Sequence, residues 1–359
     1  EGHGGALTLG TSRHGGLAVA IAFPRPARKS LAQATSVVAL LLALLIPGSS
    51  EAQTLRILSA TDTPAMAPLV ERFQALNPGV TVDYQEYQTL ALHHAVLGGA
   101  VADVVISPAM DLQVDLVNRG LARRLAMPEA VALPDWAIWR SELFGFTFEP
   151  AVIVYNREAF GPENLPREHR ELANFIRDNE AALHQRIGTY DLRGSGIGYL
   201  YATQDVVQGL QAQRMTEVLG RAGVRTFCCT AEMVAAAAAG DISIAINVIS
   251  SYALALAEHD PRVDVHFLTD YNLVMARSAF VPAAALQPEL AERFVAFLLS
   301  EDGQRLIATR SQLLPIRPLA DIDTWALRHI RAHVGSFLPI RLGPGLLTYL
   351  DARKKENFL

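Results

Sequence analysis

The sequence has very little cysteine, and all of it is in one place. Its 359 residues include two cysteines, the neighbours Cys228 and Cys229. A C-x-x-C redox motif is therefore absent, and two adjacent thiols without a nearby histidine make a poor zinc site. In an oxidising compartment the pair would close a strained vicinal disulfide, and otherwise it would remain two reduced, buried thiols. The sequence leaves both states open, and it predicts no metal site and no cofactor.

Positive charge is also scarce. The chain carries 31 lysines and arginines against 36 aspartates and glutamates, a formal net charge of −5. It contains no basic block and no stretch in which basic and aromatic residues alternate. Nucleic-acid binding surfaces depend on such clusters, so the sequence predicts no nucleic-acid partner.

Signatures of catalysis are missing as well. The sequence contains neither a G-x-S-x-G nucleophile elbow nor an H-E-x-x-H motif. Asp62 and Asp111 would face each other across strand ends, but a pair of carboxylates alone does not define a hydrolase. We predict that the protein is not an enzyme, and an exported enzyme is the alternative.

The one long apolar run lies near the N-terminus, in a three-part arrangement. Basic residues around Arg28 precede an uninterrupted apolar run at 37–46, which Pro47 ends. The run is too short to span a bilayer as a stable helix. The small residue Ala52 then offers a signal peptidase a cut before Gln53. This layout predicts a cleaved secretory signal, and the alternatives are a core helix or a retained membrane anchor.

The predicted leader, residues 1–52, is excluded from the fold prediction. Its beginning is rich in glycine and shows no pattern. The leader holds four of the 31 basic and two of the 36 acidic residues, so the mature chain has a net charge of −7 (27 − 34). No second apolar run reaches transmembrane length. We expect the mature chain to be a soluble, exported and monomeric protein of two domains.

The mature chain begins with alternating strands and helices. Asn77-Pro78-Gly79 is a helix stop signal. Strands are predicted at 55–59, 80–84 and 103–107, and helices at 66–76, 90–97 and 112–119. Such alternation predicts an α/β fold with a mostly parallel sheet.

Polar residues follow each of these three strands. Ligands bind at the carboxyl ends of the strands in such a sheet, and hydroxyls with free helix amides suit an anionic or polar small molecule. Ordinary helix capping is the alternative for each residue. The candidates are Ser59, Thr61, Asp62, Thr63, Tyr84, Tyr87, Gln88, Thr89, Ser107, Ala109 and Asp111.

A second α/β section follows an extended segment at 144–155, which we interpret as a crossover between two lobes. Its predicted helices are 171–184, 205–221 and 231–239, and its predicted strands are 188–190, 242–247 and 263–268. The segment 273–281 would return to the first lobe, where helices 288–299 and 302–310 follow. We place lobe 1 at 53–148 with 274–320, lobe 2 at 149–273, and a less regular C-terminal extension, packed on the lobes, at 321–359.

The best binding motif of the second lobe is the glycine-rich run from Arg193 to Tyr199. Its glycines let backbone amides approach an anion, Ser195 can donate a hydrogen bond, and the Arg193 guanidinium fits a carboxylate or phosphate. The alternative is a plain turn, and the ending of a Walker loop is missing. Further candidates in this section are Glu149, Gly196, Asn247, Ser250 and Tyr252.

Three separated segments carry a family resemblance. ERFQALNPGVTVDY, FTFEPAVIVYNREAF and AERFVAFLLSEDGQRLIAT occur in this order and resemble type II periplasmic solute-binding proteins of ABC transporters. The resemblance is to the ferric-binding-like branch, which includes phosphoglycerate-sensing proteins. It implies two α/β lobes, two mixed, mostly parallel sheets joined by a two-segment hinge, and capture of a small molecule by lobe closure in the periplasm.

The resemblance also implies a partner. The ligand would pass to an ABC permease in the inner membrane, and the alternative is a subunit that reports its ligand to a membrane sensor kinase.

One departure from this family bears on the ligand. Iron-binding members carry two adjacent tyrosines after a strand of the second lobe, whereas this chain has Ser250 and Ser251 there, followed by Tyr252. Neutral hydroxyls are poor ferric ligands compared with phenolates. We therefore predict a small organic anion, carboxylated or phosphorylated, and keep ferric ion as the alternative.

Overall fold

The computed structural model describes residues 6–11, 17–22, 53–127, 133–351 and 354–356, in two compact units, Glu1–Glu51 and Ala52–Leu359. In the first unit, β1 (Ala6–Thr11) pairs antiparallel with β2 (Leu17–Ala22). We predicted no structural pattern before Arg25, and this hairpin shows that the prediction was wrong. The basic and apolar parts of the predicted signal peptide lie outside the described residues. Among the described residues, no helix is long and apolar enough to cross a membrane.

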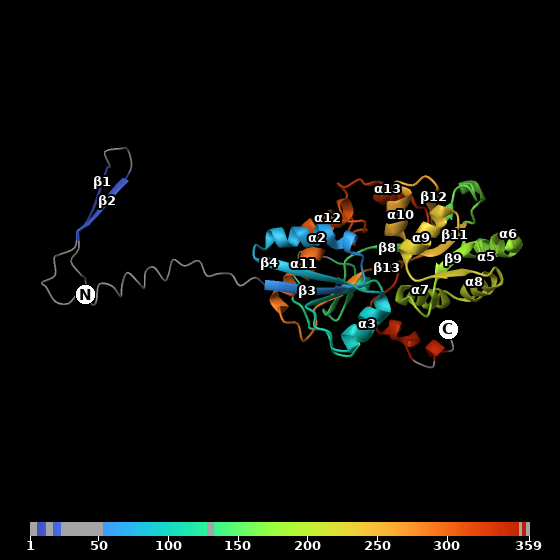
Figure 1. The fold of residues 1–359 in the computed structure, drawn as a ribbon, viewed down its shortest axis with the longest axis horizontal. Helices are drawn as coiled ribbons and strands as arrows, with labels where there is room; N and C mark the ends of the chain where they lie inside the picture. The colour runs from blue at the N-terminus through green and yellow to red at the C-terminus, as the bar shows by residue number, and fades with distance from the viewer. Residues whose placement is uncertain (1–5, 12–16, 23–52, 128–132, 352–353, 357–359) are drawn as a thin grey trace. The chain divides into compact units, whose positions relative to one another are not determined.

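A six-stranded sheet forms the first half of the second unit (Figure 1). Its order is β4-β3-β5-β14-β7-β6, with β3, β4 and β5 parallel and the other pairs antiparallel. The strands are β3 (Gln53–Ser59), β4 (Val80–Glu86), β5 (Val104–Ser107), β6 (Ile138–Trp139), β7 (Leu143–Gly145) and β14 (Ser278–Phe280).

Among the described residues, five helices belong to the same half as this sheet. They are α2 (Thr63–Leu76), α3 (Thr89–Leu97), α4 (Met110–Asn118), α11 (Pro288–Leu299) and α12 (Glu301–Thr309). Asn77 at the C-cap of α2 matches the predicted stop signal, and the helix has a proline in its first turn. Phe73 of α2 packs edge-on against Phe294 of α11, with ring centres 5.0 Å apart, in a core with β3 and β5. Met66, Leu69 and Phe73 of α2 are thus buried, whereas Leu76 in its last turn is exposed.

A seven-stranded sheet forms the other half. Its order is β10-β9-β11-β8-β13-β15, and β12 also pairs with β8. The strands are β8 (Glu149–Asn156), β9 (Ile187–Tyr190), β10 (Arg225–Phe227), β11 (Ile244–Ile249), β12 (Val263–His266), β13 (Asn272–Met275) and β15 (Phe337–Pro339). All pairs that involve β8 are antiparallel, so the share of antiparallel pairs is larger than we predicted.

The remaining described helices belong to the half that contains the seven-stranded sheet or to the segments that connect its strands. They are α5 (His169–Asp178), α6 (Glu180–Leu183), α7 (Gly196–Val207), α8 (Leu210–Arg221), α9 (Thr230–Ala239), α10 (Ser250–Ala257) and α13 (Trp325–Ala332), with 3₁₀ turns η1 (Asp135–Ala137), η2 (Pro162–Asn164) and η3 (Pro344–Tyr349). The single helix predicted at 205–221 is wrong. Two helices, α7 and α8, cover this stretch, because Gly209 between them has a φ of 109° that ends the first.

Two strand-to-strand connections run between the sheets. The chain passes from β7 to β8 in one direction and from β13 to β14 in the other. The C-terminal part also joins here, because Thr147 forms a β-bridge with Pro315 and β15 pairs with β13. The extension that we described as less regular therefore supplies a strand of the seven-stranded sheet.

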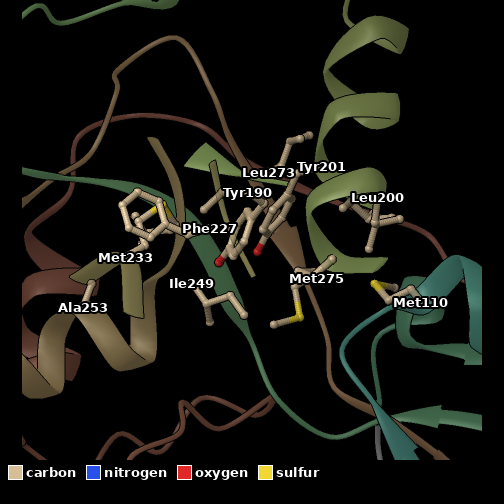
Figure 2. Close-up of a cluster of buried hydrophobic side chains, with 14 of the residues drawn as sticks. Met110, Tyr190, Leu200, Tyr201, Phe227, Met233, Ile249, Ala253, Leu273 and Met275 are labelled. Atoms are coloured by element: carbon tan, nitrogen blue, oxygen red, sulfur yellow. The ribbon is translucent and has the colours of Figure 1, made fainter. Parts of the chain in front are cut away.

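One apolar cluster includes residues from elements of both halves. Figure 2 shows Met110 of α4 in the same cluster as Leu200 and Tyr201 of α7 and Met275 of β13. The backbone N–H of Ala276 donates to the Met110 sulfur at 3.3 Å. Helices α4 and α7, which begin near predicted site residues, thus share one buried apolar cluster.

Candidate ligand-binding site

A fully buried arginine lies where the chain returns from β13 to β14. Arg277 is 1% exposed. Its Nη1 donates to Oγ1 of Thr61 at 3.0 Å, and its Nε donates to Oε1 of Glu149 at 3.4 Å. Its guanidinium lies over the ring of Tyr252, 5.2 Å from the centre. One side chain thus joins the end of β3, the start of β8 and the first turn of α10.

Ionisable side chains around Arg277 raise its pKa. Burial by itself would lower the pKa of Arg277, but Tyr252, Glu149 and Asp62 outweigh it, so the pKa is raised. Burial raises the pKa of Glu149, which is 0% exposed, and the charge of Arg277 works in the opposite direction. A close pair of opposite charges is the condition under which two buried ionisable groups stay charged.

Two phenols complete these surroundings. Burial raises the pKa of Tyr252, Arg277 opposes this rise, and the neighbouring Asp62 adds to it. Tyr84, at the end of β4, donates from its hydroxyl to the backbone oxygen of Thr61 at 2.5 Å. Its pKa is also raised by burial. Both tyrosines are therefore neutral hydrogen-bonding groups at ordinary pH.

Part of this cluster has unused hydrogen-bonding capacity. Within the described residues, Nη2 of Arg277 and Oγ of Ser250 are buried and have no hydrogen-bond partner. A buried donor that lacks an acceptor costs about 1–3 kcal/mol. A ligand oxygen placed between β3, β8 and α10 would remove that cost. We call Thr61, Asp62, Glu149, Ser250, Tyr252 and Arg277 the hinge cluster.

The glycine-rich run of the sequence begins as a turn at 192–194 and continues as the start of α7 from Gly196. Ser195 is the N-cap, and its hydroxyl accepts from the backbone N–H of Gly198 at 3.2 Å. The backbone N–H of Gly196 donates to Oγ1 of Thr89, at the start of α3, at 2.9 Å. A Cβ on Gly196 would lie 2.8 Å from Cδ1 of Leu112 in α4 and 2.9 Å from Oγ1 of Thr89, so a larger residue would require these side chains to move. These predicted site residues thus contact one another.

Tyr199 and Asp111 lie beneath the C-terminal segment. The Tyr199 hydroxyl donates to the backbone oxygen of Tyr349 at 2.5 Å, and Lys355 lies over the Tyr199 ring at 5.2 Å. Asp111 is 2% exposed, and burial raises its pKa to about 7. Lys355 acts in the opposite direction on that pKa. The C-terminal segment thus covers two residues that we predicted at the binding edge.

Asn247 belongs to a separate polar network. It sits at a bulge of β11 with a φ of 61°, and its Nδ2 donates to Asp205 at 2.9 Å. The Tyr271 hydroxyl donates to the same carboxylate at 3.1 Å, and the Tyr271 ring stacks on His169, 3.8 Å between centres. Burial raises the pKa of Asp205. A small cavity of about 20 Å³, room for a water molecule, lies among these residues.

The other predicted residues have local partners. Thr63 is exposed and donates to Glu86, and Tyr87 packs against the apolar cluster of Figure 2. Ser107 accepts from the N–H of Ala109 at 3.2 Å, which closes a turn before α4. Arg193 is exposed, so it lies outside the buried hinge cluster.

Sequence reasoning missed Arg277, the residue that joins the cluster. The available signal was a lone charge inside the apolar return segment 273–281. An arginine is almost never fully buried unless it is paired, so this position indicated a partner.

The two cysteines are thiols in the structure. Their Sγ atoms lie 2.8 Å apart, Cys228 being exposed and Cys229 half-buried. The predicted burial of the thiols is therefore wrong for Cys228. The vicinal disulfide is not formed here and stays a prediction.

Comparison with known proteins decides the family. The family model of bacterial extracellular solute-binding proteins matches residues 55–310. The chain belongs to this family. A substrate-binding protein of an ABC transporter from Agrobacterium tumefaciens is 33% identical, with a TM-score of 0.77 over 86% of this chain and 93% of that one. As a member of this family, the protein binds a solute, and its family is not enzymatic. No curated protein matches it.

More distant structures share the fold of this solute-binding protein. Iron-bound HitA from Pseudomonas aeruginosa is 21% identical, with a TM-score of 0.64 over 76% of this chain and 91% of that one. AfuA from Actinobacillus pleuropneumoniae, with fructose-6-phosphate bound, is 14% identical, with a TM-score of 0.66 over 85% and 96%. The predicted α/β fold with two mixed sheets, of the type II periplasmic binding proteins, is confirmed.

Proposed function

We propose that this solute-binding protein captures a small organic anion, carboxylated or phosphorylated, at the hinge cluster. The observation that supports the proposal is Arg277, a buried cation with one unpaired Nη2. The guanidinium fork matches the geometry of carboxylate and phosphate oxygens. The ligand would be carried in the periplasm by a monomer and released to a permease in the inner membrane.

The mechanism that we propose is closure about two crossovers. Lobe 1, 53–148 with 274–320, would supply Thr61 and Asp62, and lobe 2, 149–273, would supply Ser250 and Tyr252. Arg277 lies in the segment between β13 and β14, and Glu149 is the first residue of β8, so a ligand bound to them would favour the arrangement in which both lobes contact it. Closure follows from the higher affinity of the closed form for the ligand.

A panel of ligands tests this proposal. Thermal unfolding of the full chain would be measured with organic acids, phosphorylated metabolites, neutral sugars and ferric citrate. A ligand at about 100 times its Kd adds about 2.7 kcal/mol of stability, which raises Tm by a few degrees. We expect a shift with at least one organic anion and none with neutral sugars. A shift only with neutral sugars would refute an anion site.

Variants at the hinge cluster locate the binding. Arg277→Lys keeps the charge but loses the fork, so we expect the Kd of the anion found in the panel to rise at least tenfold. The matched control is Arg262→Lys, at an exposed arginine that pairs with Asp260. Equal affinity in the Arg277 and Arg262 variants would reject the assignment. Ser250→Ala is a milder second variant, in case the buried substitution prevents folding.

A ferric ion is the second candidate, because Tyr84 and Tyr252 both lie near Arg277. Phenolates are hard ligands for iron. Burial raises the pKa of both phenols and Arg277 adds a positive charge, which favours the organic anion. A visible phenolate-to-iron absorption band on adding ferric citrate, lost in Tyr252→Phe, would reverse this choice.

A further inference from the structure

Three donor atoms come together at the start of α9, in a part of the chain that the proposed ligand site does not use. Sγ of Cys228 lies 2.8 Å from Sγ of Cys229 and 3.1 Å from Oε2 of Glu232. All three lie within 4.8 Å of one another. Cys228 and Glu232 are exposed and Cys229 is half-buried, so an ion from solvent reaches them directly.

We infer that Cys228, Cys229 and Glu232 form a surface site for a thiophilic d¹⁰ cation such as Zn²⁺ or Cd²⁺. Two sulfur donors select soft cations over Mg²⁺ or Ca²⁺, which prefer oxygen ligands. The carboxylate supplies a third ligand, and a water molecule completes four-fold coordination. From the sequence we judged the two thiols a poor zinc site because no third ligand was evident. The structure places Glu232 beside them as that ligand.

The geometry requires one small movement. Metal–sulfur bonds of about 2.3 Å at a tetrahedral angle place two sulfurs about 3.8 Å apart, about 1 Å more than in the structure. Cys228 is exposed, so rotation of its side chain meets little resistance. The movement replaces a contact between two thiols with two bonds to the metal.

Binding is a proton exchange without electron transfer. Two S–H bonds break, two sulfur–metal bonds form, and both protons pass to the buffer. Release of two protons per metal is therefore a signature of this site.

The experiment is a Cd²⁺ titration of the full chain, reduced and then freed of reductant under nitrogen. We expect an ultraviolet thiolate-to-cadmium absorption band that saturates at one ion per chain, with two protons released. Cys228→Ser and Cys229→Ser should each lower the affinity at least tenfold. Glu232→Gln should lower it severalfold. The matched control is Glu289→Gln, an exposed glutamate in the first turn of α11.

Several outcomes would overturn the inference. One is the absence of the band, and another is equal Cd²⁺ affinity in the Cys228→Ser, Cys229→Ser double variant, which would place the ion elsewhere. Affinity unchanged by Glu232→Gln would remove the carboxylate from the site and refute the three-ligand arrangement. A chain that retains a vicinal disulfide after mild reduction, seen as a mass two protons lower, would also refute it. Arg277→Lys should leave Cd²⁺ binding unchanged, which separates this site from the hinge cluster.

Discussion

A serine is the N-cap of α7 and another is the first helical residue of α10, and the two serines have different surroundings. At α7, the Ser195 hydroxyl accepts a hydrogen bond from the third residue of the helix, as an N-cap does. At α10, the Ser250 hydroxyl is equally buried but has no partner within the described residues. The residue type alone therefore does not distinguish a structural hydroxyl from a binding one. The distinction lies in whether the protein itself satisfies the hydroxyl.

The largest expected loss of stability comes from breaking the charged pair of Arg277 and Glu149, next to α10. Glu149→Ala would leave Arg277 buried without its closest carboxylate, which we expect to cost about 3–5 kcal/mol of unfolding free energy. Urea unfolding measures it. Glu149→Gln, which keeps the shape and an acceptor oxygen, should cost less. A loss below about 1 kcal/mol in the alanine variant would show that other groups compensate the arginine.

A pH effect is expected at α4, whose first turn contains Asp111. The Asp111 carboxyl has a pKa of about 7 when folded, against 3.8 without burial. Between these values the folded chain holds a proton that the unfolded chain has lost. The stability from Asp111 is therefore complete below about pH 4 and is lost as the pH rises to about 7, by about 1.4 kcal/mol for each unit of pKa shift.

The variant Asp111→Asn separates the contribution of Asp111 to the pH dependence of stability from the contributions of other titrating groups. We expect the urea midpoint of Asp111→Asn to change less between pH 5 and pH 7 than the midpoint of the original chain does. An identical pH dependence in both proteins would mean that Asp111 ionises freely when folded.

A smaller effect is expected at α7. Ser195→Ala removes the N-cap and should cost about 1 kcal/mol. Ser195→Gly should cost only a few tenths, because glycine is tolerated at this position. Thermal unfolding at one fixed pH measures both. Equal stability of the alanine variant and the original chain would show that the capping bond is replaced by solvent.

The smallest effect on stability is expected at α10. Ser250→Ala removes the cost of a buried hydroxyl that has no partner, but it also removes that atom's packing contacts. Because the two terms oppose each other, we expect a net change of less than about 0.5 kcal/mol in unfolding free energy. Its effect on the Kd of the bound anion should be severalfold. A loss of stability as large as that of Ser195→Ala would abolish the distinction between the two serines.

Much of the fold was predictable because strong local signals agree with the packing. Proline and Asn77 mark the ends of α2, and the apolar run of β5 is buried on both faces, as the sequence indicates. The start of α7 was missed because Gly196 and Gly198 disfavour a helix locally. Close packing of Gly196 against Leu112 outweighs that preference. Strand β15 has three residues, one of them proline, so only its pairing with β13 defines it.

The candidate site was predictable in part. Thr61, Glu149 and Tyr252 were chosen as strand-end or crossover residues, and the structure places all three around Arg277. Arg277 itself was missed, since one residue in an apolar run has no periodicity or motif. Arg193, the charge that we predicted for the anion, is exposed. Sequence spacing locates the ends of strands but not which distant charge faces them.

The position of β15 has a consequence for how the chain is made. The last strand in the sequence pairs with β13, which precedes it by about sixty residues. As the chain emerges from one end, the seven-stranded sheet has an unpaired edge at β13 until residues 337–339 arrive. An unpaired strand edge is a place where another chain can add a strand. A nascent or truncated chain that stops before β15 would therefore be the form most prone to aggregate.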